Sequence, residues 1–321
     1  MENKKLKAAV IGIGNMWGNH VRTYHEIDSI DLVAIADLNE ALGNEMSEKY
    51  SAKYYKSYEQ MLEENEIDIV SIVVPTKFHF SVAKYCIEKG VHILLEKPIT
   101  LDITQGEELL SLADKKGINM LVGHIERFNP AVQKVKQMID AGELGDITAI
   151  TARRIGGLPP QIRDANIVVD LSIHDIDIAN YLTGKIPEEV TIHKKKNHLE
   201  EREDSAEIFM KYDTVSAYIQ TNWVSPVKMR KLTVTGSDGY LEMDFITQKI
   251  EFYKSNYEKF KEKNSTYTDY IMKFADPDKI DISVGKKEPL KEEILFLANA
   301  ITSGNRINSQ FALDALKIAL I

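Results

Sequence analysis

A glycine-rich turn lies near the start of the chain, directly after the apolar run Leu6–Ile11. It reads Gly12-Ile13-Gly14-Asn15-Met16, and Trp17 and Gly18 follow. A turn of this kind between a strand and a helix directs backbone N–H groups and the positive end of the helix at an anion, above all at a pyrophosphate. In the usual G-x-G-x-x-G spacing the third glycine would stand where this chain has Trp17, so the turn alone is a weak signal.

An acidic residue supports the same interpretation. Asp37 ends the apolar run Leu32–Ala36, where a dinucleotide-binding domain has the carboxylate that accepts hydrogen bonds from the adenosine ribose. Leu38 and Asn39 follow it and supply no cation for a 2′-phosphate. The turn and Asp37 together predict a site for NAD rather than NADP. The residues expected to hold this cofactor are Gly12, Ile13, Gly14, Asn15, Met16 and Asp37.

A lysine stands at the end of another predicted strand. Glu96-Lys97-Pro98 directly follows the apolar run Val91–Leu95. Ligands of parallel sheets bind outside the carboxyl ends of the strands, so we expect Glu96 and Lys97 beside the reactive ring of a bound nicotinamide. Pro98 biases the Lys97 backbone toward extended conformations. A lysine at a strand end is more often simply solvated, and its position beside the cofactor favours a chemical role.

The segment Asn166–Leu182 predicts a helix with one ionisable stripe on an otherwise apolar surface. At about 100° per residue the members of the stripe lie within about 60° of one another; they are Asp170, His174, Asp177 and Tyr181. Buried ionisable groups are costly unless they are paired or belong to a site. His174 is therefore either a core histidine bonded to Asp170 or part of a reactive site. Metal ligation is not expected, because no third His or Cys stands at ligand spacing.

The composition limits the setting in which these residues act. A length of 321 residues predicts about two domains. The net charge of −9 argues against nucleic acid or an anionic membrane as the partner. No apolar run reaches the length of about 18 residues that spans a bilayer. The lone Cys86 excludes an intramolecular disulfide framework and a Cys-based zinc site, and it fits the reducing cytoplasm, where we expect the protein.

Residues 1–123 alternate short apolar runs with amphipathic stretches. This alternation predicts an α/β domain, a Rossmann fold with a doubly wound parallel sheet whose strands are covered on both faces. The expected strands are Leu6–Ile11, Leu32–Ala36, Ile69–Val74, Val91–Leu95 and Ile118–Val122. The expected helices between them include Asn39–Tyr50, Phe78–Lys89 and Thr104–Lys116. We assign this part of the chain to NAD binding.

Residues 124–321 follow a different pattern, which predicts an α+β domain with an open, mainly antiparallel sheet. The expected helices are Pro130–Ala141, Asn166–Leu182, Leu290–Ser303 and Gln310–Ile321. The expected strands are Ile147–Ile155, Val190–Lys196, Ala206–Lys211, Val215–Trp223, Lys231–Thr235, Tyr240–Asp244 and Lys249–Tyr253. Turn residues separate the strands, among them Ser225-Pro226.

Taken together, the motifs resemble those of the Gfo/Idh/MocA oxidoreductase family over nearly the full length of the chain. The matching motifs are the Gly12 turn with Asn19-His20, Val74-Pro75-Thr76 with His79, Gly90-Val91-His92 leading to Glu96-Lys97-Pro98, and Asp170 with His174. The resemblance implies a nicotinamide cofactor contacted by Gly12, Gly14, Asp37, Pro75, Thr76, His79, Glu96 and Lys97. It also implies a catalytic trio of Lys97, Asp170 and His174. Residues 124–321 would then form the substrate-binding and oligomerisation domain, with homodimers or homotetramers joined through the open sheets.

Three further segments, Gly123–Pro130, Gly157–Arg163 and Thr221–Arg230, resemble the UDP-N-acetylglucosamine 3-dehydrogenases of surface-polysaccharide pathways within that family. Residues 151–163 also hold Arg153, Arg154 and Arg163 and no acid, a basic patch suited to a diphosphate. The expected substrate contacts are Arg127, Arg154, Arg163, Asp170 and His174.

The activity expected from this resemblance is oxidation of a sugar hydroxyl, at C3 of UDP-N-acetylglucosamine or its uronate, with hydride transfer to nicotinamide. Three alternatives stay open. The protein could be an inositol or other polyol dehydrogenase, or a glycosidase-like relative that uses bound NAD transiently. It could also be a non-catalytic regulator that senses NAD or a sugar, because a fold does not by itself determine a function.

Overall fold

The computed structural model describes residues 5–13, 17–158, 165–255 and 277–321. The chain divides into two compact units. The first consists of Met1–Phe128 with Glu288–Lys317, and the second of Asn129–Lys287 with Ile318–Ile321. This division differs from the contiguous one expected from the sequence, because helix α9 (Pro289–Ser303) and most of α10 (Gln310–Ala319) belong to the first unit. Their apolar faces predict burial, but a periodic pattern does not reveal which sheet a helix will cover.

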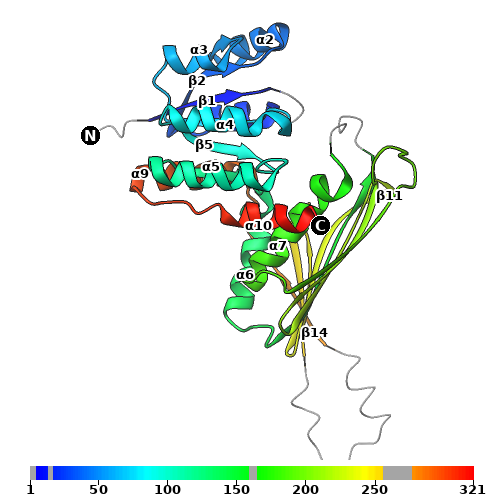
Figure 1. Ribbon diagram of the computed structural model, residues 1–321. Coiled ribbons are helices and arrows are strands. Elements are labelled where there is room, and N and C mark those ends of the chain that lie inside the picture. The colour runs from blue at the N-terminus through cyan, green and yellow to red at the C-terminus, as the bar shows by residue number, and fades with distance from the viewer. Residues whose placement is uncertain (1–4, 14–16, 159–164, 256–276) are drawn as a thin grey trace, which may run out of the picture. The chain divides into compact units, whose positions relative to one another are not determined.

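The first unit is built on a six-stranded parallel sheet with the order β3-β2-β1-β4-β5-β6 (Figure 1). The strands are β1 Leu6–Ile11, β2 Ile30–Ala36, β3 Lys53–Tyr55, β4 Ile69–Ile72, β5 His92–Glu96 and β6 Met120–Gly123. This is the strand order of a Rossmann domain, in which the chain reverses direction across the sheet between β1 and β4. The predicted doubly wound fold is therefore confirmed.

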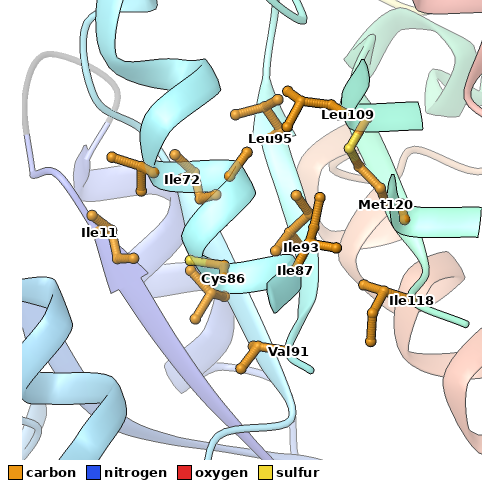
Figure 2. Close-up of a cluster of buried hydrophobic side chains, with 14 of the residues drawn as sticks. Ile11, Ile72, Cys86, Ile87, Val91, Ile93, Leu95, Leu109, Ile118 and Met120 are labelled. Carbon is orange, nitrogen blue, oxygen red and sulfur yellow. The ribbon is translucent and has the colours of Figure 1, made fainter. Parts of the chain in front are cut away.

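Both faces of this sheet are covered, as the continuous apolar runs predicted. Alternate residues of β1 enter different cores: Val10 packs in one with Tyr24 and Leu297, and Ile11 in the other with Cys86 and Leu109. Figure 2 shows the second core, where side chains of β1, β4, β5 and β6 meet those of α4 and α5. The remaining helices of the unit are α1 Trp17–His25, α2 Glu40–Tyr50, α3 Tyr58–Glu64, α4 His79–Glu88 and α5 Ile103–Lys116.

The second unit contains an eight-stranded sheet with the order β14-β13-β12-β11-β7-β10-β9-β8. Its strands are β7 Ile147–Gly157, β8 Glu189–Lys195, β9 Ser205–Tyr212, β10 Val215–Asn222, β11 Val224–Gly236, β12 Gly239–Asp244, β13 Lys249–Lys254 and β14 Asp278–Ile282. All neighbours pair antiparallel except β7 and β10, which run parallel. The predicted α+β domain with a mainly antiparallel sheet is confirmed.

In the part of the second unit that the structure describes, helices pack on one face of this sheet only. Helices α6 (Pro130–Asp140) and α7 (Ile173–Thr183) cover the first face. Along β9 the side chains of Ala206, Ile208 and Met210 are buried, whereas Phe209 between them is 51% exposed. This alternation is typical of a sheet that is open on one side.

Some elements differ from the expected ones. The short strand β3 and helix α3 were not anticipated, and β14 lies in a region without a predicted strand. Strand β11 continues through Ser225-Pro226, where a turn was expected. The pairing of β11 with β7 shifts register between Val224 and Met229, and such a bulge accommodates a proline inside a strand. Among the helices that the structure describes, none has both the length and the apolar character needed to cross a membrane.

Candidate functional site

The turn after β1 requires a glycine at position 12. Gly12 has φ +84°, and a Cβ atom there would lie 2.8 Å from both the carbonyl carbon and the carbonyl oxygen of Val73. Helix α1 begins at Trp17. The turn therefore passes close to the end of β4, as it does where backbone N–H groups must approach a pyrophosphate. Gly14, Asn15 and Met16 lie outside the described residues, as does the side chain of Trp17.

Asp37 is fixed beside this turn at the end of β2. Its Oδ2 accepts a hydrogen bond of 2.6 Å from the Ile13 N–H, and its Oδ1 accepts one of 2.7 Å from the Asn39 N–H. The Tyr54 hydroxyl donates to the Asp37 carbonyl oxygen at 2.9 Å. Each carboxylate oxygen keeps a further lone pair, so the carboxylate is positioned and still able to accept bonds from ribose hydroxyls. The residues present therefore fit the adenosine half of NAD.

Glu96 and Lys97 stand at the carboxyl end of β5. The Glu96 side chain is only 15% exposed, and its Oε1 lies 2.9 Å from Nε2 of His20. Gly123 faces it on β6, and a Cβ there would lie 3.2 Å from Glu96 Oε2, so the glycine leaves room for the carboxylate. Burial would raise the pKa of the Glu96 carboxyl, but the hydrogen bond from His20 and the nearby positive charges outweigh it and lower the pKa.

His79 joins the ends of two neighbouring strands. Its Nδ1 lies 2.8 Å from the Pro98 carbonyl oxygen and its Nε2 lies 3.0 Å from that of Val74. The ring is buried, and burial lowers its pKa against the opposing effect of these two carbonyls. The sequence led us to expect a direct cofactor contact at His79. In the structure both ring nitrogens instead lie within hydrogen-bond distance of backbone carbonyl oxygens. The Val74 carbonyl directly precedes Pro75-Thr76, and the Pro98 carbonyl directly follows Lys97.

The helix that carries Asp170 and His174 begins with a π-helical turn. The sequence predicted one continuous helix, whereas Val168–Ser172 forms a π-turn and α7 follows. The Asn166 side chain accepts hydrogen bonds of 3.1 Å from the N–H groups of Val168 and Val169, which starts the helix here. Single π-turns are rare and frequently mark functional sites.

The polar stripe of this helix is half-buried at three positions and buried at one. Asp170, His174 and Tyr181 are half-buried, and Asp177 is buried. Most of the apolar side chains around them are buried. The stripe therefore lies where the helix leaves the core, so that Asp170 and His174 are held by the fold and still reachable.

Three polar contacts attach the buried side of this helix to the sheet. The Ser172 hydroxyl lies 2.6 Å from that of Thr221 on β10, and the Tyr212 hydroxyl on β9 donates to Asn180 at 2.8 Å. Asp175 accepts two hydrogen bonds of 2.9 Å from Arg154 on β7. Sequence reasoning missed Asp175. A buried acid next to the stripe was nevertheless a signal, because such a charge needs a cationic partner.

The expected basic patch is not one surface. Arg154 is 5% exposed, forms the bidentate pair with Asp175, and lies over the Phe245 ring at 4.9 Å. Arg153 is exposed, and because successive side chains of a strand alternate, it belongs to the opposite face of the sheet. Arg163 lies outside the described residues.

Arg127, another expected substrate contact, belongs to the first unit. Its guanidinium stacks 3.9 Å above the ring of Phe311 in α10. The adjacent His124 also packs its buried ring against Phe311, edge to face at 5.5 Å. This segment therefore anchors α10 to the Rossmann domain.

Comparisons with known proteins agree with both halves of this architecture. Residues 6–124 match the family described as "Oxidoreductase family, NAD-binding Rossmann fold", and residues 132–242 match the "GFO/IDH/MocA C-terminal domain". The UDP-N-acetylglucosamine 3-dehydrogenase of Acidithiobacillus ferrooxidans is 30% identical over 249 residues, which cover 77% of each chain. The myo-inositol 2-dehydrogenase of Thermotoga maritima is 29% identical over 192 residues, 58% of this chain and 57% of that one.

A solved structure of a UDP-N-acetylglucosamine 3-dehydrogenase from Acidithiobacillus ferrooxidans has the same two-domain architecture. It aligns with a TM-score of 0.85 and 26% identity, over 98% of this chain and 96% of that chain. Family matches in both domains, a relative 30% identical over most of its length and the Rossmann strand order all agree. The chain therefore belongs to the Gfo/Idh/MocA family of oxidoreductases, with an NAD-binding Rossmann domain at its amino terminus.

Proposed function

We propose that the protein is an NAD-dependent dehydrogenase of a nucleotide sugar, oxidising the C3 hydroxyl of UDP-N-acetylglucosamine or of its uronate. The geometry that carries the cofactor assignment is the fixed Asp37 carboxylate, 2.6 Å from the Ile13 N–H of the glycine turn. The turn would hold the pyrophosphate and Asp37 the adenosine ribose. Pro75, Thr76, Glu96 and Lys97 would contact the nicotinamide half.

The reaction would depend on Lys97, Asp170 and His174. Bound NAD would supply the hydride acceptor. Of Lys97 and His174, one would take the proton of the substrate hydroxyl while the other donates a hydrogen bond to the same oxygen. Asp170 would orient the pair and support its charge.

The extent of the similarity supports a nucleotide sugar as the substrate. The sequence of the Acidithiobacillus ferrooxidans UDP-N-acetylglucosamine 3-dehydrogenase aligns over 77% of this chain. The aligned part of the myo-inositol dehydrogenase covers 58% of this chain. Inositol oxidation is the second candidate on that shorter similarity. The diphosphate would require cations other than Arg154, because Asp175 already occupies its guanidinium.

The experiment that tests this proposal is NADH formation, followed by absorbance, with UDP-N-acetylglucosamine, its uronate and myo-inositol compared at equal concentrations. We expect the nucleotide sugars to be oxidised much faster than inositol. Faster oxidation of inositol would replace the proposed substrate by the second candidate. Absence of NADH with all three substrates, in protein that binds NAD, would refute the dehydrogenase assignment.

We also propose that the protein forms homodimers or homotetramers through the open face of the eight-stranded sheet. Phe209 on that face is 51% exposed and packs 4.8 Å from the ring of Tyr218. Exposed aromatic residues of this kind are enriched in protein interfaces. Replacing Phe209 with Lys should shift the mass measured by light scattering toward the monomer, and an unchanged mass would refute this interface.

A further inference from the structure

A chain of buried polar groups lies beneath the end of β5. The Tyr24 hydroxyl is 2.8 Å from Ser71 Oγ, which is 3.2 Å from Nδ1 of His20. Nε2 of His20 in turn lies 2.9 Å from Glu96 Oε1. Tyr24, Ser71 and His20 have no exposed surface. The groups come from α1, β4 and β5, and all belong to the Rossmann domain.

One arrangement of protons satisfies every member of this chain. When Nε2–H of His20 donates to the Glu96 carboxylate, Ser71 can donate to Nδ1 and Tyr24 can donate to Ser71, so that each polar hydrogen has an acceptor. The order of carboxylate, imidazole and hydroxyl is that of a hydrolytic triad, but Ser71 is fully buried within β4 and no substrate reaches it. These hydrogen-bonded groups therefore orient the Glu96 carboxylate, and Ser71 does not serve as a nucleophile.

A second carboxyl lies near Glu96 and adds no charge. Glu293 of α9 is fully buried, and neither of its carboxyl oxygens has a hydrogen-bond partner among the described residues. Burial, together with the charge of Glu96, raises the pKa of Glu293 well above its usual value. Of the two carboxyls, Glu293 therefore holds a proton more readily, and Glu96 is the one that more readily carries the negative charge.

The other titratable groups that face Glu96 come from each element around it. Lys97 follows Glu96 directly after the end of β5, His20 is on α1, His79 is on α4, and Glu293 is on α9. The neighbouring strands contribute Ser71 and Gly123, which carry no charge. Of these groups, His20 makes the hydrogen bond that keeps the Glu96 carboxylate ionised and oriented.

We propose that the Glu96 carboxylate, held by His20, biases the bound cofactor toward its oxidised form. This inference rests on the proposed function, because it takes the nicotinamide to bind at the carboxyl end of β5. The oxidised ring carries a positive charge and the reduced ring carries none. A fixed anion in a poorly solvated site therefore stabilises NAD⁺ and not NADH. His20 is a positioning residue that acts through Glu96.

The test measures Kd for NAD⁺ and for NADH by calorimetry in the full chain, without substrate. Glu96→Gln should raise the ratio of Kd for NAD⁺ to Kd for NADH about tenfold, because it removes the charge and keeps the shape. His20→Gln should keep the wild-type ratio, because a Gln amide can place an N–H group where Nε2 donates. His20→Asn is the matched variant, because its shorter amide reaches only the place of Nδ1.

The pH dependence separates the role of His20 from a general structural role. In His20→Asn the ratio should match the wild type near pH 8.5 and approach that of Glu96→Gln near pH 6. Without the hydrogen bond from His20, burial raises the pKa of the Glu96 carboxyl, so the carboxyl takes up a proton more readily as the pH falls. In the wild type, where the His20 hydrogen bond lowers the pKa of Glu96, the ratio should change less between the two pH values than it does in His20→Asn.

Each outcome supports or overturns the inference. A wild-type ratio in Glu96→Gln overturns it, and a ratio in His20→Asn that does not change with pH overturns the role of His20. If Glu96→Gln does not fold, as judged by its circular dichroism, the pH dependence in His20→Asn decides. Wild-type protein that binds neither NAD⁺ nor NADH would refute the proposed function itself, whereas binding with an unaltered ratio in the variants refutes only the inference.

Discussion

Arg154 and Asp175 join β7 to α7 through two parallel hydrogen bonds of 2.9 Å, with less than a tenth of either side chain exposed. Removing one partner of a buried ion pair leaves an uncompensated charge in the core. Asp175→Asn should therefore cost about 3–5 kcal/mol of the free energy of unfolding of this domain, measured by urea denaturation.

The control for that prediction is an exposed ion pair of the same sheet. Lys211 donates to Glu189 at 2.8 Å, and both side chains are more than half exposed. Glu189→Gln should cost less than about 1 kcal/mol, because solvent screens the pair. Equal losses in the two variants would show that burial does not determine the strength of the Arg154–Asp175 pair.

Glu293→Gln should gain stability relative to the wild type as the pH rises from 5 to 8. The pKa of Glu293 is raised by burial and by Glu96, whereas in the unfolded chain it lies near the ordinary value of about 4.3. Protonation of Glu293 therefore makes its full contribution to the free energy of unfolding of the wild type below about pH 4.3. The wild type loses about 1.4 kcal/mol per pH unit as the pH rises toward the folded-state pKa. The amide has no such proton to lose.

Thermal unfolding midpoints of wild type and Glu293→Gln at pH 5 and pH 8 check this prediction. Glu45→Gln, an exposed position on α2, is the control and should show no widening difference with pH. A constant difference between Glu293→Gln and wild type would mean that the buried carboxyl does not hold a proton across this range.

Gly12→Ala and Gly90→Ala separate backbone strain from steric contact. Both glycines have a positive φ, +84° and +82°, but a Cβ at Gly90 meets nothing within 4 Å, whereas at Gly12 it meets the Val73 backbone. Gly90→Ala should cost about 1–2 kcal/mol from strain alone. Gly12→Ala should cost about 1–3 kcal/mol more and weaken NAD binding. Calorimetric titration with NAD⁺ would contradict the account if the two variants bound it equally well.

Leu38→Arg should improve the affinity for NADP⁺ about tenfold without a similar gain for NAD⁺. Leu38 is 81% exposed and directly follows Asp37, so an arginine there could reach the 2′-phosphate. Leu38→Gln, which adds length but no charge, is the control. Kd values for both cofactors check the prediction, and a gain of the same size with Leu38→Gln would contradict it.

Most of the Rossmann half could be predicted, because its signals are local. Continuous apolar runs mark β1, β2, β4, β5 and β6, and the glycine turn with Asp37 marks the ligand edge. Strand β3 was missed because Lys53–Tyr55 is only three residues long and polar in part. Helix α3 did carry a start signal, since the Ser57 side chain caps the N–H of Gln60.

The features that were not predicted correctly depend on tertiary contacts, which the order of residues along the chain does not reveal. Arg153 and Arg154 are neighbours in sequence, but the alternation of a strand sends them to opposite faces of the sheet. The partner of Arg154 is Asp175, which lies 21 residues further along the chain on α7. A helix at Leu290–Ser303 was predicted, but the sequence pattern does not show which of the two sheets a helix packs against. The π-turn at Val168–Ser172 is not marked by any sequence motif.

The most direct test of the proposed function is the rate of NADH formation from UDP-N-acetylglucosamine by His174→Ala and Lys97→Ala, at saturating NAD⁺. We predict that each variant is slower than the wild type by about 10²–10⁴-fold and binds NAD⁺ with nearly unchanged Kd. Wild-type turnover in either variant would contradict the role given to that residue, and wild-type turnover in both would contradict the proposed catalytic site.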